Sequence, residues 1–212
     1  MEDGNYTMWN NWAKKRFGNP VYDNWLDGYK KILATNKHSQ ILDLGCGNGA
    51  DTKYLLERGF KVISCDFSQE ALKNVRHFIP GSNTKKVDIT KTLPFENGSF
   101  GIVIADLSLH YFNSKTTKRV LAEIKRITQL GGYLLARVLS ASNFKDPETE
   151  IGPKIEEKFF WEGCFGKRIF DKKDIEEYFG IFSYLSYKEY KMTRDDDEYR
   201  KPRKVFEIVA II

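Results

Sequence analysis

The sequence is poor in cysteine and contains no long hydrophobic run. Its three cysteines, Cys46, Cys65 and Cys164, are an odd number without metal-site spacing. They predict neither a disulfide framework nor a cysteine-only zinc centre, and a reducing compartment fits them best. No stretch reaches the roughly 18 apolar residues that a transmembrane helix needs. The first residues also lack the basic-then-apolar order of a secretion signal. We therefore expect a cytoplasmic protein that is not a membrane protein.

The sequence also has little excess of charge of one sign. Its 34 basic and 29 acidic side chains leave a formal net charge of +5. The basic residues are interspersed with acids, whereas a dedicated nucleic-acid binder concentrates them on one face. Nucleic acid is therefore not the expected partner. With 41% hydrophobic and 14% aromatic residues, the chain can form a core and does not have the composition of a disordered protein.

Short apolar runs alternate with helical patterns from residue 21 onward. Strands are predicted over residues 40–44, 61–66, 86–89, 100–106, 132–139, 184–192 and 204–212. Helices are predicted over residues 21–33, 51–58, 68–77, 115–129 and 171–180. This alternation predicts an α/β fold with a mostly parallel, doubly wound sheet. The last two strands have no helix between them, so they predict an antiparallel pair, joined as a hairpin by residues 193–203.

A glycine-rich turn, DLGCGNG, follows the first predicted strand and opens a helix. Glycines there let the backbone turn tightly and let a ligand approach without meeting a Cβ atom. Continued to Ala50, the pattern also satisfies the fingerprint of dinucleotide-binding proteins. A Walker phosphate loop is excluded, because no Gly-Lys-Ser/Thr follows. Both NAD(P) and S-adenosylmethionine remain compatible with the turn itself.

Acidic residues at the ends of the neighbouring strands distinguish between NAD(P) and S-adenosylmethionine as the expected ligand. Asp66 ends the second strand, where a carboxylate can accept hydrogen bonds from both hydroxyls of an adenosine ribose. Asp43 lies beside the glycine turn, where it would repel a pyrophosphate but attract an ammonium group. Asp88 could accept from an adenine amino group, and Asp106 lies at the same sheet edge. Asp43 therefore favours S-adenosylmethionine.

Five segments in order resemble the successive motifs of the class I S-adenosylmethionine-dependent methyltransferases. They are ILDLGCGNG, VISCDFS, KKVDIT, LPFENGSFGIVIADLSLHYF and LGGYLLARVLS, and the resemblance runs from about Val21 to the C-terminus. It implies a Rossmann-like, seven-stranded sheet whose last strand is antiparallel. Small-molecule enzymes, including tellurite-resistance and thiopurine methyltransferases, are the most similar members.

The resemblance also implies roles for individual residues around S-adenosylmethionine. Asp43, Gly45, Cys46 and Gly47 would surround its methionine part. Asp66 would bind the ribose, while Phe67, Asp88 and Ile89 would surround the adenine. Ala105 and Asp106 would lie where cofactor meets substrate. Trp9 and Trp12 resemble tryptophans that cover the cofactor in some members, although plain surface packing explains them equally well.

The expected substrate side lies after the fourth and fifth strands. His110 is the candidate general base, with a structural histidine as the alternative, and Tyr111 is expected to line the pocket. Arg137 stands in an apolar strand, so it either binds an anion in the pocket or pairs with a core carboxylate. Arg168 is expected to face the pocket as well, unless Glu156 and its acidic neighbour neutralise it. Together the two arginines predict a small acidic or oxyanionic substrate.

These observations predict a single methyltransferase domain over residues 1–212. Residues 1–34 would form an N-terminal cap, and residues 141–170 a substrate lid or an ordinary connector. The expected function is methyl transfer to a small molecule by direct displacement. The alternatives are an NAD(P)-dependent oxidoreductase and a non-catalytic S-adenosylmethionine-binding protein. RNA or protein methylation is disfavoured, because no Asn-Pro-Pro-Tyr motif follows the fourth strand.

Overall fold

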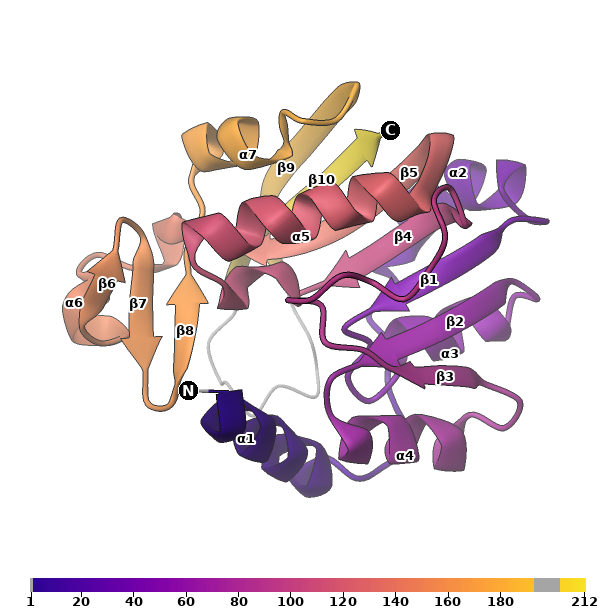
Figure 1. The fold of residues 1–212 in the computed structure, drawn as a ribbon, viewed down its shortest axis with the longest axis horizontal. Helices are drawn as coiled ribbons and strands as arrows, with labels where there is room; N and C mark the ends of the chain where they lie inside the picture. The colour runs from indigo at the N-terminus through magenta and orange to yellow at the C-terminus, as the bar shows by residue number, and fades with distance from the viewer. Residues whose placement is uncertain (1, 193–202) are drawn as a thin grey trace.

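A seven-stranded sheet forms the centre of the molecule (Figure 1). The computed structural model describes residues 2–192 and 203–212. The strands are β1 (Gln40–Leu44), β2 (Lys61–Asp66), β3 (Asn83–Lys86), β4 (Phe100–Asp106), β5 (Thr128–Leu139), β9 (Tyr184–Met192) and β10 (Arg203–Ile211). Their order is β3-β2-β1-β4-β5-β10-β9. Strands β3 to β5 pair in parallel, and β10 is antiparallel to both β5 and β9. The predicted fold class is confirmed.

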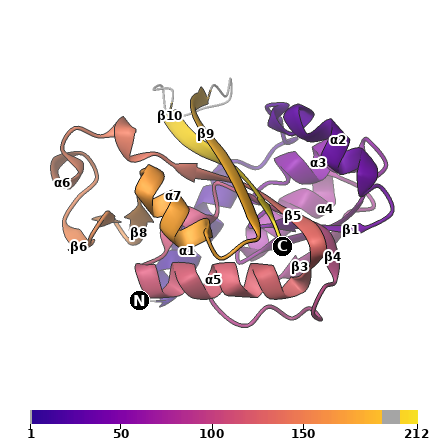
Figure 2. The same ribbon diagram turned by 90° about the horizontal axis from the view of Figure 1, so that it is seen from above.

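Helices cover both faces of this sheet (Figures 1 and 2). On one face, α5 (Ser114–Ile127) and α7 (Lys172–Phe179) pack with alternate residues of β4 and β5 in the larger apolar core. On the other face lie the 3-10 helix η1 (Trp25–Tyr29), α2 (Lys30–Thr35) and α3 (Ala50–Leu56). Successive strand residues point to opposite faces, so neighbours in one strand enter different cores.

Two predicted elements differ from those observed. The segment before η1 is not helical, and Asn24 has a left-handed backbone with φ of 31°. The third strand ends at Lys86 instead of continuing to residue 89. Beyond it, the Asp88 carboxylate accepts hydrogen bonds from the backbone N–H and hydroxyl of Thr90, at 2.9 and 2.6 Å. Such a local turn competes with strand pairing.

Residues 141–170 form a small subdomain beside the main sheet (Figure 1). It contains η3 (Ala141–Asn143), α6 (Pro147–Glu150) and an antiparallel sheet of β6 (Lys154–Glu156), β7 (Phe159–Glu162) and β8 (Phe165–Arg168). These strands are not among those predicted from the sequence. Strand β8 packs beside η2 (Leu109–Tyr111), the short helix after β4. The insert therefore stands at the carboxyl edge of the main sheet.

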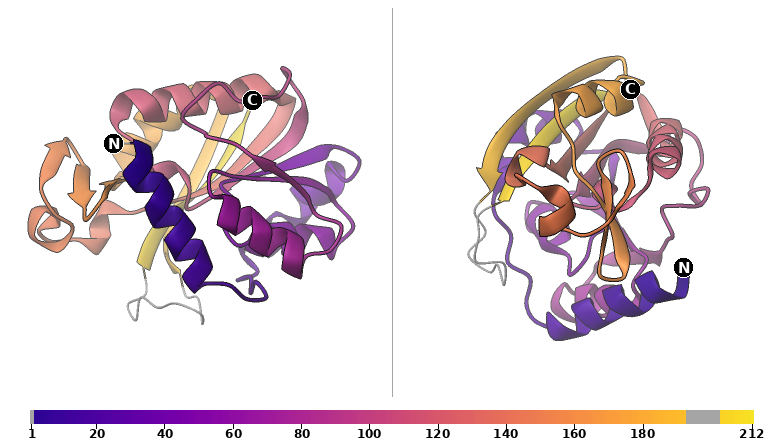
Figure 3. Two further views of the ribbon diagram at one scale, coloured as in Figure 1. Left: turned by 60° about the horizontal axis from the view of Figure 1, so that its bottom comes forward. Right: turned by 90° about the vertical axis from the view of Figure 1, so that its left-hand side faces the viewer.

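The N-terminal helix α1 (Glu2–Lys15) packs against α4 (Gln69–Phe78) and lies along the same edge (Figure 3, left). Ser68 caps α4 as predicted, and its hydroxyl donates to Asn10 Oδ1 at 2.7 Å. The Asn74 side-chain amide donates to the Ala13 carbonyl at 3.0 Å. None of the helices in the described part of the chain is long and apolar enough to span a membrane. The predicted hairpin over residues 193–203 lies mostly outside the described residues.

Candidate active site

A cleft of about 1930 Å³ opens where the parallel strands end. Its walls are the glycine turn, the ends of β2 and β4, η2, α1 and the insert strands β7 and β8. Open α/β sheets bind ligands at this carboxyl edge. Of the residues predicted for the site, the cleft is lined by Trp12, Asp43, Gly45, Cys46, Gly47, Asp66, Phe67, Asp88, Ile89, Asp106, His110 and Tyr111.

The glycine turn is held by backbone bonds and by close packing. The N–H groups of Gly45 and Cys46 both donate to the Cys65 carbonyl at 2.8 Å. Gly45 has φ of +80°, and a Cβ atom there would lie 2.5 Å from the Ser108 Cβ. Only glycine adopts this conformation without strain and accepts so close a neighbour. The Ser108 hydroxyl donates to the Leu44 carbonyl at 2.8 Å, which ties the segment after β4 to the turn.

Asp66 is fixed at the end of β2 by backbone donors from two elements. Its carboxylate accepts from Gly47 N at 2.9 Å and from Ser68 N at 2.7 Å. Burial raises its pKa, while these hydrogen bonds oppose the rise. Phe67 adds a third backbone hydrogen bond, and a carboxylate has about four acceptor positions, so acceptor capacity is left for a ligand. This remaining acceptor capacity suits hydroxyl donors such as those of a ribose.

Asp43 is a buried acid beneath the glycine turn. Its side chain accepts from the Thr52 hydroxyl at 2.6 Å, and Thr52 in turn contacts the Ser64 hydroxyl at 2.7 Å. Burial raises the pKa of Asp43 to about 7, and the charges of Asp106 and Asp66 add to this shift. No Lys or Arg of the described residues forms an ion pair with it. A cation placed beside it would be stabilised, which fits an amino group and not a pyrophosphate.

Ala105 does not line the cleft, which differs from the prediction. Its side chain is fully buried in the core on the α5 face of the sheet. The reason is strand alternation: neighbouring residues of β4 point to opposite faces, and Asp106 is the one that reaches the cleft.

Arg137 does not face the cleft either, so the predicted anion-binding role is wrong. Its guanidinium is fully buried and donates to both carboxylate oxygens of Asp106, at 2.6 and 2.8 Å. It also donates to Asp23 at 2.7 Å and lies 4.6 Å from the centre of the Trp25 ring. Burial alone would lower the pKa of Arg137, but the two carboxylates hold it above its ordinary value. This is the core ion pair that the sequence left as the alternative.

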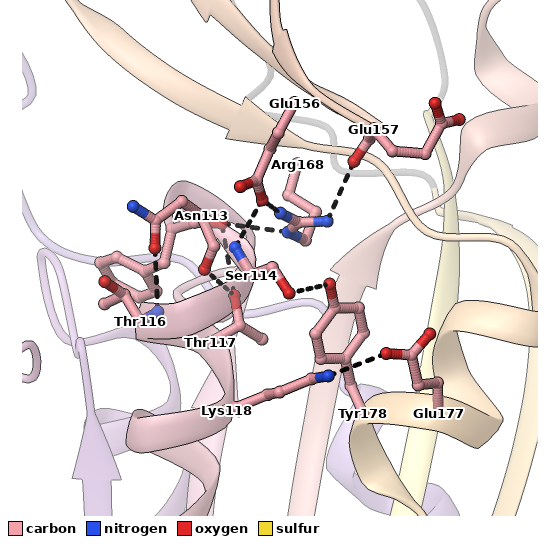
Figure 4. Close-up of polar contacts among 11 residues, drawn as sticks. Asn113, Ser114, Thr116, Thr117, Lys118, Glu156, Glu157, Arg168, Glu177 and Tyr178 are labelled. Atoms are coloured by element: carbon pink, nitrogen blue, oxygen red, sulfur yellow. Dashed lines mark hydrogen bonds and ion pairs between the residues drawn. The ribbon is translucent and has the colours of Figure 1, made fainter.

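Arg168 is likewise a structural residue (Figure 4). Its side chain is 2% exposed and forms an ion pair with Glu156. It also donates to the Phe112 carbonyl at 3.0 Å and to the Glu157 carbonyl at 3.3 Å. Glu156 accepts in turn from the backbone N–H of Ser114, the first residue of α5. The acid neutralises the arginine and anchors the insert to α5, so Arg168 does not reach the cleft.

His110 and Tyr111 lie in η2 and line the cleft as predicted. His110 is 2% exposed, and its Nδ1 atom is buried without a hydrogen-bond partner among the described residues. Burial lowers the pKa of His110 to about 3, and nearby Lys167 and Arg203 add to the effect. The imidazole is therefore neutral near pH 7.

Aromatic rings from three elements meet beside these residues. Trp9 of α1 packs edge-on against Tyr111, with ring centres 4.8 Å apart. Phe165 of β8 lies 5.7 Å from Tyr111 and 6.0 Å from Trp9. These contacts join the N-terminal helix and the insert across the cleft. The contact of Phe165 with Trp9 could not be predicted from the sequence, because no local pattern marks two residues so distant in the chain as neighbours.

Comparison with known proteins agrees with this architecture. Residues 42–136 match a family model described as a methyltransferase domain. This part of the chain is therefore similar to methyltransferase domains. The chain is 33% identical over 99 residues to a demethylmenaquinone methyltransferase of Thermobifida fusca, which covers 45% of this chain and 41% of the relative. It is 30% identical over 100 residues to an uncharacterized methyltransferase of Synechocystis, covering 47% of each. The chain thus matches less than half the length of these relatives.

Solved structures extend the likeness across most of the chain. One is a methyltransferase described as dependent on S-adenosylmethionine, from Methanosarcina mazei, with a TM-score of 0.68 and 22% identity. The match covers 81% of this chain and 91% of that one. Another, from Clostridium acetobutylicum, has a TM-score of 0.64 and 18% identity, covering 90% and 92%. The match to the family model agrees with the predicted enzyme class, and the solved structures establish the fold.

Proposed function

We propose that the chain is an S-adenosylmethionine-dependent methyltransferase that acts on a small molecule. The observation that carries this proposal is the pair of acids flanking the glycine turn. Asp43 is a buried carboxylate without an ion-pair partner among the described residues, and Asp66 is an oriented carboxylate with acceptor capacity left. One suits the amino group of a methionine moiety, and the other suits ribose hydroxyls. A dinucleotide would bring its pyrophosphate against Asp43.

S-adenosylmethionine, when bound, supplies a methyl group that is already activated as a sulfonium. The remaining task of the protein is to orient the acceptor and exclude water, and such alignment contributes up to about 7–11 kcal/mol. The aromatic contacts among Trp9, Tyr111 and Phe165 close the cleft on the side of α1 and the insert. They support the role of residues 1–34 as a cap and of residues 141–170 as a lid.

We propose that His110 orients the acceptor by hydrogen bonding. A neutral imidazole with a pKa of about 3 binds a proton weakly, so it is a poor general base near pH 7. It can still accept a hydrogen bond or donate one from its other nitrogen. An acceptor that is already nucleophilic, such as a carboxylate or a thiolate, needs no base.

The small-molecule acceptor is supported by the names of two relatives. Besides the demethylmenaquinone enzyme, a malonyl-[acyl-carrier protein] O-methyltransferase of Hamiltonella defensa is 29% identical over 121 residues. Similarity to tellurite-resistance or thiopurine enzymes stays a prediction, as do the cytoplasmic location and the absence of a nucleic-acid partner.

Ligand-dependent thermal unfolding tests the proposal. S-adenosylhomocysteine at 100 times its dissociation constant should stabilise the fold by about 2.7 kcal/mol, whereas NAD(P) should not. A screen of thiols, amines, carboxylates and chalcogen oxyanions for S-adenosylhomocysteine release then tests catalysis. Stabilisation by NAD(P) alone would refute the proposal in favour of an oxidoreductase. Binding without release from any acceptor class would favour a non-catalytic binding protein.

A further inference from the structure

Two basic side chains in the cleft stand apart from the acids at the strand ends. The wall formed by the ends of β1, β2 and β4 carries Asp43, Asp66 and Asp106. The opposite wall, formed by β8 and the start of β10, carries Lys167 and Arg203. None of the residues of β7, β8 and β10 that line the cleft is acidic. Other basic residues, among them Lys86, Lys91 and Arg119, also line the cleft, so the wall of β8 and β10 is distinguished by carrying cations and no acid among its described lining residues.

Lys167 is placed on the second wall by the pairing of the insert strands. It faces Phe160 in the antiparallel register of β7 and β8, and its side chain is 7% exposed. Glu162 of β7 forms an ion pair with its ammonium but does not line the cleft. The ammonium has three donors, so one ion pair leaves donors for a ligand. Its neighbour Gly166 leaves room for the Phe159 ring, which packs where a Cβ atom would lie.

Arg203 lies at the start of β10, on the same side as Lys167. Lys167, Arg203 and His110 all line the cleft, and after burial the charges of the two cations contribute to lowering the pKa of His110. The buried imidazole, whose Nδ1 has no hydrogen-bond partner in the described part of the chain, therefore stands beside these two cations. The imidazole of His110 and the two cations therefore line the same region of the cleft, which we call the cationic wall.

Apolar side chains surround this region. They come from the end of β5, the end of β9, the start of β10 and the insert: Leu139, Met192, Val205, Trp161 and Phe165. Such a chamber buries a hydrocarbon or aromatic body, while a few polar groups fix its orientation. Phe165 lies under Lys167, with the ammonium 5.5 Å from its ring centre.

We propose that Lys167 and Arg203 select an acceptor that carries a carboxylate on an apolar body. The carboxylate binds at the cationic wall, and the apolar body fills the chamber lined by Leu139, Phe165 and Met192. This inference rests on the proposed function, because it assigns the substrate class of the same cleft. It also transfers the anion-binding role predicted for Arg137 and Arg168 to two residues that do line the cleft.

Binding of matched acids and amides tests the proposal. The protein is saturated with S-adenosylhomocysteine, and calorimetry measures the dissociation constants of benzoate, 4-hydroxybenzoate and octanoate beside their primary amides. Each pair shares its body and differs in charge. We expect at least one acid to bind tenfold or more tightly than its amide. Lys167→Met and Arg203→Gln should each weaken acid binding by roughly tenfold or more, since hydrogen bonds to charged groups are lost, and change amide binding by less than about threefold.

Lys118→Met is the matched control, because it removes an exposed cation that pairs with Glu177 outside the cleft. Stabilisation by S-adenosylhomocysteine verifies that each variant is folded, and Lys167→Arg should retain acid binding. The proposal is overturned if no acid is preferred over its amide, or if Lys118→Met weakens acid binding as much as Lys167→Met. Failure of the parent protein to bind S-adenosylhomocysteine would instead refute the proposed function.

Discussion

Replacing Arg137 by methionine should strongly destabilise the fold. Methionine keeps much of the apolar side-chain volume but removes the charge. The change leaves Asp106 and Asp23 without the guanidinium that binds both of them, at 2.6–2.8 Å. It also removes the contact of the guanidinium with the Trp25 ring.

The size of the effect follows from burial. Removing one partner of a buried ion pair costs about 3–5 kcal/mol, because the remaining charge stays buried. Asp106 is 10% exposed and Asp23 is 16% exposed, so water relieves part of this cost. We therefore expect a loss near the lower limit, about 3 kcal/mol, from a total stability of about 5–15 kcal/mol. The melting temperature should fall by roughly 6–12 °C.

Urea unfolding of three variants measures this effect. Lys118→Met, which breaks an exposed pair, should cost less than about 1 kcal/mol. The triple variant Arg137→Met, Asp106→Asn, Asp23→Asn should be more stable than Arg137→Met alone, because no charge remains buried. A single variant within 1 kcal/mol of the parent, or a triple variant as unstable as the single one, would refute the reasoning.

The remaining predictions concern the titrating acids and His110. Asp66→Ala should weaken S-adenosylhomocysteine binding by tenfold or more in calorimetry, because two hydrogen bonds to a charged acceptor are lost; unchanged affinity in a folded variant would remove Asp66 from the site. His110 has a folded-state pKa of about 3, below its ordinary value of 6.5, so its stabilising contribution is present above pH 6.5 and is lost as pH falls toward 3. Between pH 7 and pH 5, the free energy of unfolding of His110→Gln should therefore fall by about 2 kcal/mol less than that of the parent, as measured by urea unfolding. An equal fall in the variant and the parent would contradict this. Asp43 has a raised pKa of about 7, so its pH dependence is opposite to that of His110. Its stabilising contribution to the free energy of unfolding is present below about pH 4 and is lost as pH rises through 7. Asp43→Asn should remove this loss of stability with rising pH, and it should also weaken S-adenosylhomocysteine binding. If the free energy of unfolding of the ligand-free variant falls with rising pH as steeply as that of the parent, the raised pKa is wrong.

The sequence by itself determined the sheet and the acidic half of the cleft. Asp43, Gly45 and Asp66 are placed by local signals, since each lies at the end of a strand that its own apolar pattern marks. Parallel strands bring their carboxyl ends to one edge, so these residues meet without further information. The glycine turn is equally local, because the positive φ of Gly45 depends on its own lack of a Cβ atom.

The tertiary structure alone decided the partners of the buried cations. Arg137 and Asp23 are 114 positions apart, and no pattern in either segment indicates their contact. Arg168 was predicted to bind substrate because its strand in the insert, and the turn that brings Glu156 beside it, were not predicted. A buried guanidinium must be paired, but an acid in the core and an anion in a cleft satisfy this requirement equally well. Which of them does so depends on chain packing between distant segments, and the same packing brings Lys167 and Arg203 to the cleft.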